Sequence, residues 1–577
     1  MKFLELADAF SQLGATTSRR AMVRILSGLI RRLDVKELSP AIYLIQARLG
    51  PPFSTLDFGL DEKLAMRALA DASGQPVEAV ETRFKRVGDL GTVANDILPE
   101  RSQGLSIVDT FHSLERIAQV SGPGAQVSKI ELLSDLLTKM NGQEGQYVIR
   151  IVLGRLRLGV GDATIMDALS WAVAGNSSLR PAVERAYDMT SDLGLAAEVL
   201  FRGGVDALEK IAPKPGRPVR PALAERLSSA QDIVRHVGRV LVEPKYDGIR
   251  LQVHRLDDEV RIFSRRIEDV THMFPEIVAA TKRQVRAAQV IFEGEATAYN
   301  PDTGEYLPFQ VTAQRRRKRG TAEMAARYPL RLFAFDLLSV DGEDYTIRPL
   351  KERRQRLQQV LRTEPDSTIT ISPGIITSDP KEVEHFFLES VTAGLEGIVA
   401  KRLESSYRAG VRSYDWVKLK RGYQAKLRDT VDTVLVGYLL GKGRRARLGI
   451  GSLLAAVYDS DKDEFKTVAK IGSGLSDENW VKLRQLLDQD RVSRRPARVN
   501  SLIEPDVWVQ PHYVVEVYAD EITRSPVHTA GKRDGEPGYA LRFPRLVDWI
   551  RADKSPEDAT TEDEIVKLYK MQSKPTR

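Results

Sequence analysis

The stretch E-P-K-Y-D-G-I-R, Glu243 to Arg250, places Lys245 at the end of an apolar strand and before an Asp-Gly turn. A surface lysine beside a hairpin turn is the simplest interpretation, because Asp-Gly favours tight turns. A nucleophilic lysine is the alternative, since burial and nearby cations lower the pKa of an amine and make its neutral form available. The motif alone leaves both interpretations open.

Carboxylates, cations and aromatic rings recur on the strands that follow this lysine. Alternating apolar and polar residues predict a β-hairpin from Ile249–His254 and Val260–Arg265, whose second strand carries F-S-R-R. In F-E-G-E-A, Glu293 and Glu295 are two apart and share one strand face. L-F-A-F-D, from Leu332, offers rings on which a base could stack. Cations, carboxylates and rings together are suited to binding a nucleotide.

Two later motifs add further cations. G-L-E-G-I-V-A-K, Gly394 to Lys401, brings another carboxylate and another lysine. In W-V-K-L-K, Trp416 to Lys420, the tryptophan and both lysines face one way while the aliphatic pair faces the core. Each motif alone also fits an exposed strand face, a core aromatic or a surface ion pair. The order of the motifs along the chain is therefore what distinguishes a functional site from these structural interpretations.

The chain divides into regions of different composition. Up to about residue 210, apolar residues lie three and four apart, which predicts successive helices, for example in Ile130–Met140 and Gly145–Val152. The proline-rich stretch Ile211–Ala222 predicts a linker. Strands dominate from Val240 to Lys420, around a charged helix at Lys351–Arg362. Further strands are expected at Val290–Ala298, Leu330–Leu338, Gly397–Lys401 and Asp415–Lys420.

A third region begins near Gly422. Short strands such as Thr433–Leu440 and Val514–Tyr518 alternate with glycine-rich turns, which is typical of a small β-barrel. A helix over Asp558–Tyr569 is expected to close the chain. The run of cations at Arg315–Arg319 predicts a solvated loop, with a nucleic-acid contact as the alternative.

Composition excludes several functional classes. Of the 577 residues, 86 are Lys or Arg and 79 are Asp or Glu, giving a net charge of +7, which suits a polyanionic partner without requiring one. The chain contains no cysteine, so disulfides, thiolate zinc sites and cysteine nucleophiles are excluded. No apolar run of about 18 residues is present, and Glu5 and Asp8 interrupt the N-terminal segment. We therefore expect a soluble protein without a membrane partner.

A cluster of glycines and arginines stands out in the helical region. In G-R-L-R-L-G-V-G-D-A-T-I, which starts at Gly154, Arg155 and Arg157 lie beside glycines that permit close backbone approach. A helix end with two solvated arginines explains the segment equally well. The sharper hypothesis is a grip on a phosphate backbone.

The ordered motifs resemble those of ATP-dependent DNA ligases, in the nucleotidyltransferase superfamily, and most closely the archaeal replicative type. The resemblance continues through Glu516–Pro526, L-R-F-P-R at Leu541–Arg545 and R-A-D-K at Arg551–Lys554. It implies a multidomain fold: an all-α DNA-binding domain (1–212), an α+β nucleotidyltransferase or adenylation domain (213–421) and a C-terminal β-barrel OB-fold (422–577). It also implies sealing of nicked duplex DNA in replication, repair and recombination, in the cytoplasm at the nucleoid.

The same resemblance implies roles for individual residues. Lys245 would take AMP from ATP as a phosphoramide, Glu243 would contact the adenine amine and Phe335 would stack on the ring. Arg250 and Arg265 would hold ribose and phosphate oxygens, with Arg265 also meeting the 5′-phosphate of the nick. The remaining nucleotide-binding residues would be Lys401, Glu295 at the ribose, Arg412, Lys418 and Lys420 at the α-phosphate, and Arg551, Asp553 and Lys554 at the departing pyrophosphate.

The implied cofactor is Mg²⁺, with Mn²⁺ as a substitute, held by Glu295 and Glu396. Glu293 stands where many relatives have aspartate. A monomer is expected. A sliding clamp as partner is left open, because no glutamine-plus-paired-aromatic motif stands near Gln103.

Rival interpretations remain on the sequence alone. NAD-dependent ligases carry a four-cysteine zinc module, which this chain lacks. Capping enzymes and RNA ligases share the nucleotidyl core but not the long helical N-terminal region. A non-enzymatic scaffold descended from a ligase would have lost Lys245, Glu295 or the R-A-D-K motif, and all are present.

Overall fold

A computed structural model describes residues 1–299, 306, 307, 312, 315, 321–364, 367–393, 395–420, 430–441, 449–519, 521–533 and 536–572. The chain forms two compact units, residues 1–211 and 212–577. The division falls at the start of the proline-rich stretch. That stretch packs on the second unit, where the backbone N–H groups of Val219 and Ala222 donate to Gln252 and Tyr407.

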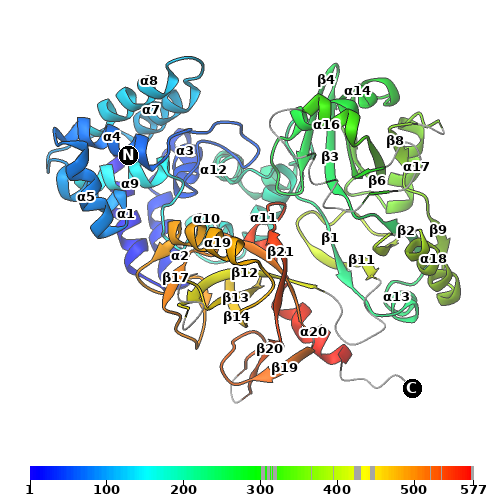
Figure 1. Ribbon diagram of the computed structural model, residues 1–577. Helices are drawn as coiled ribbons and strands as arrows, with labels where there is room; N and C mark the ends of the chain where they lie inside the picture. Colours follow the sequence, from blue (N-terminus) through cyan, green and yellow to red (C-terminus); the bar gives the residue numbers. More distant parts are fainter. Residues whose placement is uncertain are drawn as a thin grey trace. The chain divides into compact units, whose positions relative to one another are not determined.

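Residues 1–211 are built from helices, as the apolar spacing predicts (Figure 1). In α1 (Phe3–Ala15), the buried Phe3, Leu6, Phe10 and Leu13 are three or four residues apart and form one apolar face. The further helices are α2 (Arg19–Ile30), α3 (Val35–Ile45), α4 (Glu62–Ser73), α5 (Val77–Val87), α6 (Leu90–Ile97), α7 (Ile107–Gln119), α8 (Ala125–Leu137), α9 (Gly142–Val152), α10 (Asp162–Ala174), α11 (Arg180–Thr190) and α12 (Leu193–Glu209). Among the described residues, no helix has the length and apolar character needed to span a bilayer.

Two sheets form the central part of the second unit. One has the strand order β1-β11-β10-β2-β9, and the other the order β4-β3-β5-β6-β7 with β8 beside β6. Their strands are β1 (Leu223–Arg226), β2 (Val240–Lys245), β3 (Ile249–Leu256), β4 (Glu259–Ser264), β5 (Gln289–Ala298), β6 (Leu330–Val340), β7 (Glu343–Asp344), β8 (Ile369–Ile371), β9 (Ile375–Thr377), β10 (Gly397–Arg402) and β11 (Arg412–Lys420).

Helices cover these sheets and close their cores (Figure 1). Helices α13 (Ala230–Val237) and α18 (Pro380–Thr392) pack against the first sheet, where Val417 and Leu419 point into the core. Helices α14 (Pro275–Gln284) and α17 (Leu350–Val360) pack against the second sheet, and α16 (Thr321–Arg327) packs on α14. The opposite faces of the strands are left to line a cavity.

The C-terminal part is rich in short strands. The main sheet has the order β15-β17-β12-β13-β14-β16, β18 pairs with β12 and β21, and β19 pairs with β20. The elements are β12 (Thr430–Leu439), β13 (Ser452–Asp459), β14 (Glu464–Ile471), α19 (Asp477–Gln489), β15 (Arg491–Val492), β16 (Val499–Asn500), β17 (Val507–Val509), β18 (Val514–Tyr518), β19 (Glu521–Ser525), β20 (Gly538–Arg542), β21 (Arg545–Ile550) and α20 (Glu562–Gln572).

Most expected elements are confirmed, with three differences. The predicted hairpin forms, but β4 ends at Ser264, so Arg265 follows the strand. The last helix begins at Glu562, because Pro556–Asp558 forms a separate 3₁₀ turn. Arg315 is buried and its guanidinium bonds Glu276 at 2.6 Å, contrary to a solvated loop. Residues 316–319, 421–429 and 442–448 lie outside the described residues.

Candidate active site

A cavity of about 640 Å³ lies between the two central sheets and the C-terminal part of the second unit. Its walls contain every nucleotide- or metal-binding residue predicted for these regions: Glu243, Lys245, Arg250, Arg265, Glu295, Phe335, Glu396, Lys401, Arg412, Lys418, Lys420, Arg551, Asp553 and Lys554. Residues distant in sequence are therefore brought to one site.

Strand register explains how three strands of the first sheet build one wall. Antiparallel pairing places Lys245, Gly397 and Lys420 in one row across β2, β10 and β11. Two residues further along the strands, the row that faces the same way holds Glu243 and Lys418 on either side of Val399. A glycine is required between the two lysines, because Gly397 has a φ of +147° and an added Cβ would lie 2.1 Å from the Leu419 carbonyl oxygen.

Lys245 and Lys420 share one carboxylate. The Lys245 ammonium donates a hydrogen bond to Glu396, and Lys420 Nζ lies 2.5 Å from the other carboxylate oxygen of Glu396. Burial opposes ionisation of Glu396, but the charges of Lys245 and Lys420 outweigh it and lower the pKa of this carboxyl. The candidate nucleophile is thus held in an ion pair with a carboxylate that a second lysine shares.

A second carboxylate faces Lys245 from the other sheet. Burial raises the pKa of Glu295 to about 7, with Lys245 and Arg250 opposing the shift and Asp247 and Glu396 adding to it. Arg250 is anchored nearby, since it donates to Glu293 at 2.7 Å and to the Ala222 carbonyl at 2.7 Å. Glu295 is thus a buried carboxyl of the cavity with both cations and acids close to it.

Aromatic rings and a buried lysine mark one end of the cavity, termed here the base end. Lys401 Nζ lies 4.4 Å from the ring centroid of Phe335 and 4.3 Å from that of Trp416. The same atom lies 2.6 Å from Glu243. Burial lowers the pKa of Lys401, although Glu243 and Asp336 oppose the shift.

Cations gather at the other end, termed the phosphate end. Arg412 donates to Glu564 of α20 at 2.8 Å, and Arg226 lies 3.3 Å from the same carboxylate. Burial, followed by the charges of Arg226 and Arg412, lowers the pKa of Lys418 well below its usual value. A polyanion would relieve this concentration of positive charge.

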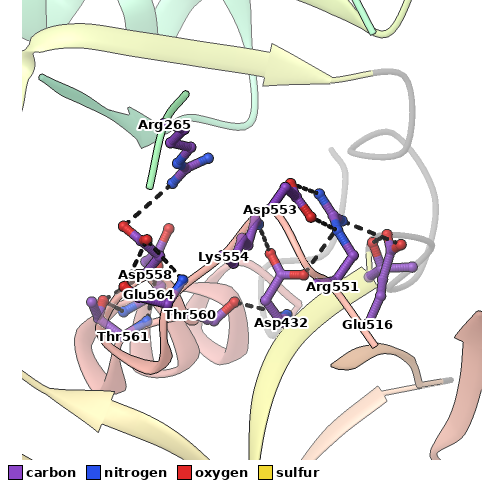
Figure 2. A network of polar contacts seen from close by, with 12 residues as sticks. Arg265, Asp432, Glu516, Arg551, Asp553, Lys554, Asp558, Thr560, Thr561 and Glu564 are labelled. Atoms are coloured by element: carbon purple, nitrogen blue, oxygen red, sulfur yellow. Dashed lines mark hydrogen bonds and ion pairs between the residues drawn. The ribbon is translucent and has the colours of Figure 1, made fainter. Parts of the chain in front are cut away.

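The C-terminal part contributes its own cations to the phosphate end (Figure 2). Lys554 pairs with Asp432, and Arg551 makes a two-pronged contact with Asp553 at 2.8 Å while lying 3.5 Å from Glu516. Arg265, which follows β4, lies 3.9 Å from Asp558. These cations are therefore matched by acids of the C-terminal part.

The two arginines predicted to grip DNA lie in the first unit. Arg157 has a φ of +57°, a left-handed conformation that glycine normally adopts, and lies 3.8 Å from Asp89. Arg155 lies 3.1 Å from Glu62. Both guanidiniums pair with acids of the same unit.

Several site residues were missed by the sequence reasoning. Arg354 of α17 bonds Glu243, Tyr407 bonds Glu293, and Asp432 and Glu564 pair with phosphate-end cations. These residues stand outside the quoted motifs. Only Arg354, in the doubled arginines of a charged helix, carried a visible signal.

A cavity with a lysine at a strand end, an aromatic base end and a cationic phosphate end defines a nucleotidyltransferase. Three families match the chain: "DNA ligase N terminus" over residues 2–170, "ATP dependent DNA ligase domain" over 221–420 and "ATP dependent DNA ligase C terminal region" over 446–554. The chain belongs to the ATP-dependent DNA ligase family.

Full-length relatives support this assignment. A "Probable DNA ligase" of Dictyoglomus thermophilum is 50% identical over 574 residues, which is 100% of this chain and 98% of the relative. A protein of the same name from Dictyoglomus turgidum matches to the same extent. The "DNA ligase" of Aeropyrum pernix is 42% identical over 99% of this chain and 98% of its own.

Proposed function

We propose that this chain seals nicks in duplex DNA through an AMP adduct on Lys245. The observation that carries the proposal is the position of Lys245, which ends β2 inside the cavity between Glu396, Glu295 and Lys420. A lysine held at such a point is suited to covalent nucleotidyl transfer.

In the first step, Lys245 Nζ attacks the α-phosphorus of ATP. The new N–P bond replaces the bond to the bridging oxygen, which leaves with pyrophosphate. The Lys245 ammonium must lose its proton beforehand, and its ion pair with Glu396 has to open for this, because a carboxylate of lowered pKa keeps the proton on the lysine. Arg412, Lys418 and Lys420 stabilise charge on the α-phosphate, while Arg551 and Lys554 orient the leaving pyrophosphate.

Two transfers follow on the DNA. The 5′-phosphate of the nick attacks the adenylate phosphorus and releases Lys245, with Arg265 holding that phosphate. The 3′-hydroxyl then attacks the 5′-phosphorus and expels AMP, which closes the strand.

A divalent cation fits the carboxylates of this site. The donors are Glu295 and Glu396, and burial is the main cause that raises the pKa of Glu295, so a bound cation would stabilise the ionised form of this buried carboxyl. Mg²⁺ typically combines one or two carboxylates with phosphate oxygens and water. When bound, Mg²⁺ (or Mn²⁺) would neutralise charge that develops on the phosphates.

The remaining parts of the chain complete the proposal. We assign a DNA-binding domain to 1–212, an adenylation domain to 213–421 and an OB-fold to 422–577, with Arg155 and Arg157 contacting the phosphate backbone. A monomer acting at the nucleoid in the cytoplasm suits this substrate. A sliding clamp is not included, because no residue of the chain argues for one.

The test is covalent labelling with ATP labelled at the α-phosphate, in the presence of Mg²⁺. We expect label on the unaltered chain and on Lys282→Ala, a substitution of an exposed lysine of α14, but none on Lys245→Ala. Addition of nicked duplex DNA should discharge the label and produce a sealed strand. Label that persists in Lys245→Ala would contradict the proposal.

A further inference from the structure

Two consecutive arginines of α17 reach into the two central sheets. Arg353 donates to both carboxylate oxygens of Asp336 on β6, at 2.7 and 2.9 Å, and both side chains are fully buried. Arg354 donates to Glu243 on β2 at 2.6 Å and to the Ser372 carbonyl at 2.7 Å. The charged helix, to which the proposed reaction gives no role, therefore ties the nucleotide-binding strands together.

Glu243 lies between two cations. Its Oε1 accepts from Arg354, and its Oε2 lies 2.6 Å from Lys401 Nζ. The side chains of Glu243 and Lys401 are each 2% exposed, and that of Arg354 is 13% exposed. A carboxylate placed between two cations offers only acceptor oxygens to a ligand.

One oxygen of Glu243 has acceptor capacity left. Within the described part of the chain, the buried Oε2 accepts no hydrogen bond of good geometry, although Lys401 is close to it. Glu243 lines the cavity at the base end, together with Phe335 and Trp416. It precedes Lys245 by two residues on the same strand face, about 7 Å away. A flat base stacked at these rings would therefore turn one edge toward Glu243.

We infer that Arg354, together with Lys401, sets a preference for adenine by holding the Glu243 carboxylate as a hydrogen-bond acceptor aimed at the 6-amino group of the base. The inference rests on the proposed nucleotide transfer. An amine at position 6 donates to the carboxylate, whereas the carbonyl oxygen of guanine would face it acceptor against acceptor. Sites built on a buried hydrogen bond reject ligands that leave it unmade. Arg354 does not line the cavity, so it is a positioning residue that acts through Glu243.

The test compares three nucleotides in self-labelling of the full chain: ATP, GTP and purine riboside triphosphate, which lacks the 6-amino group. The quantity compared is the labelling rate divided by the nucleotide concentration. For the unaltered chain we expect this value to be about 100-fold or more higher with ATP than with either of the other two nucleotides. In Arg354→Met, the ratio of ATP to purine riboside triphosphate should fall by about tenfold, because Glu243 loses its alignment with the amine.

Matched variants separate this role from a general structural one. Arg356→Met changes an arginine of the same helix whose guanidinium donates to Gln359 at 3.2 Å, and this variant should keep the full ratio. Arg354→Lys retains a cation beside Glu243 and should keep more of the ratio than Arg354→Met. If Arg354 acts through Glu243, adding Arg354→Met to Glu243→Gln should not lower the ratio further.

The outcomes are distinguishable. An equal loss with ATP and purine riboside triphosphate in both Arg354 variants would overturn the inference, because a disordered helix would affect both nucleotides alike. Normal labelling of the unaltered chain with ATP would leave the proposed function intact in that case. No label on the unaltered chain with any nucleotide would overturn both.

Discussion

The base end and the phosphate end of the cavity differ in the origin of their charge partners. At the base end, Glu243, Lys401 and Arg354 come from β2, β10 and α17 and pair with one another. At the phosphate end, Arg412 is paired by Glu564 of α20, and Lys554 is paired by Asp432 of β12. The charge partners at the base end thus all belong to the central part, whereas the acids that pair with the phosphate-end cations belong to the C-terminal part.

This difference indicates two kinds of nucleotide recognition. A base can enter a site whose hydrogen-bonding groups are already fixed, so little reorganisation is needed. A triphosphate has to compete with Glu564 and Asp432 for cations that these carboxylates already neutralise. We expect substitutions at the base end to disturb the fold, and substitutions of the phosphate-end acids to alter phosphate affinity.

The largest effect on stability should come from Arg353→Met, because Arg353 supports the base end from behind by pairing with Asp336, the neighbour of Phe335 on β6. Removing one partner of a fully buried ion pair leaves Asp336 uncompensated, which costs about 3–5 kcal/mol. Thermal or urea unfolding would measure the loss. Arg348→Met is the control, because its pair with Glu352 is about half exposed and should contribute less than about 1 kcal/mol. Equal losses in the two variants would contradict a preformed base end.

A pH-dependent effect should come from Glu295, which lies between the two ends. Its pKa of about 7 exceeds the ordinary value of 4.5, so the folded chain holds a proton that the unfolded chain releases. Its stabilising contribution is complete below about pH 4.5 and is lost as pH rises through 7, by about 3 kcal/mol at most. The measurement is unfolding in a metal chelator between pH 5 and about 8.

Glu295→Gln is the matched variant for this titration. Burial lowers the pKa of His254 to about 3 and of His528 to about 4. Both histidines therefore increase the free energy of unfolding of the protein as pH rises through the same window. They are unchanged in the variant, so the difference curve isolates Glu295. A difference that does not vary with pH would contradict the assigned environment.

The smallest effect on stability is expected from Arg265→Met at the phosphate end. Arg265 and Asp558 are 3.9 Å apart, and the arginine side chain is 27% exposed, so the pair should contribute less than about 1 kcal/mol to stability. Sealing of a pre-adenylylated nick should nevertheless slow strongly, because Arg265 is proposed to hold the 5′-phosphate. An unfolding midpoint that drops as far as in Arg353→Met would remove the distinction between the two ends.

The sequence predicted the strands and the residues on them, because two-residue alternation fixes which side chains share a face. It placed Trp416, Lys418 and Lys420 on one face and Val417 and Leu419 in the core, as the structure has them. It did not predict that β4 ends before Arg265 or that α20 begins at Glu562, since element ends depend on local hydrogen bonds.

The charge partners could not be predicted in the same way. Glu564 follows Arg412 by 152 positions, and Arg354 follows Glu243 by 111. Such pairs depend on tertiary packing, and no local periodicity reports them. The family motifs identified the cations that line the cavity but not the acids that pair with them.

The most direct test of the contrast between the two ends is the affinity of Glu564→Gln for two ligands, measured by calorimetry. The ligands are adenosine and an ATP analogue with a methylene group between the α- and β-phosphorus atoms, which cannot transfer AMP. Removing the competing carboxylate should tighten the analogue by about tenfold, or about 1.4 kcal/mol, and leave adenosine unchanged. Unchanged binding of the analogue, or equal shifts for both ligands, would contradict the account.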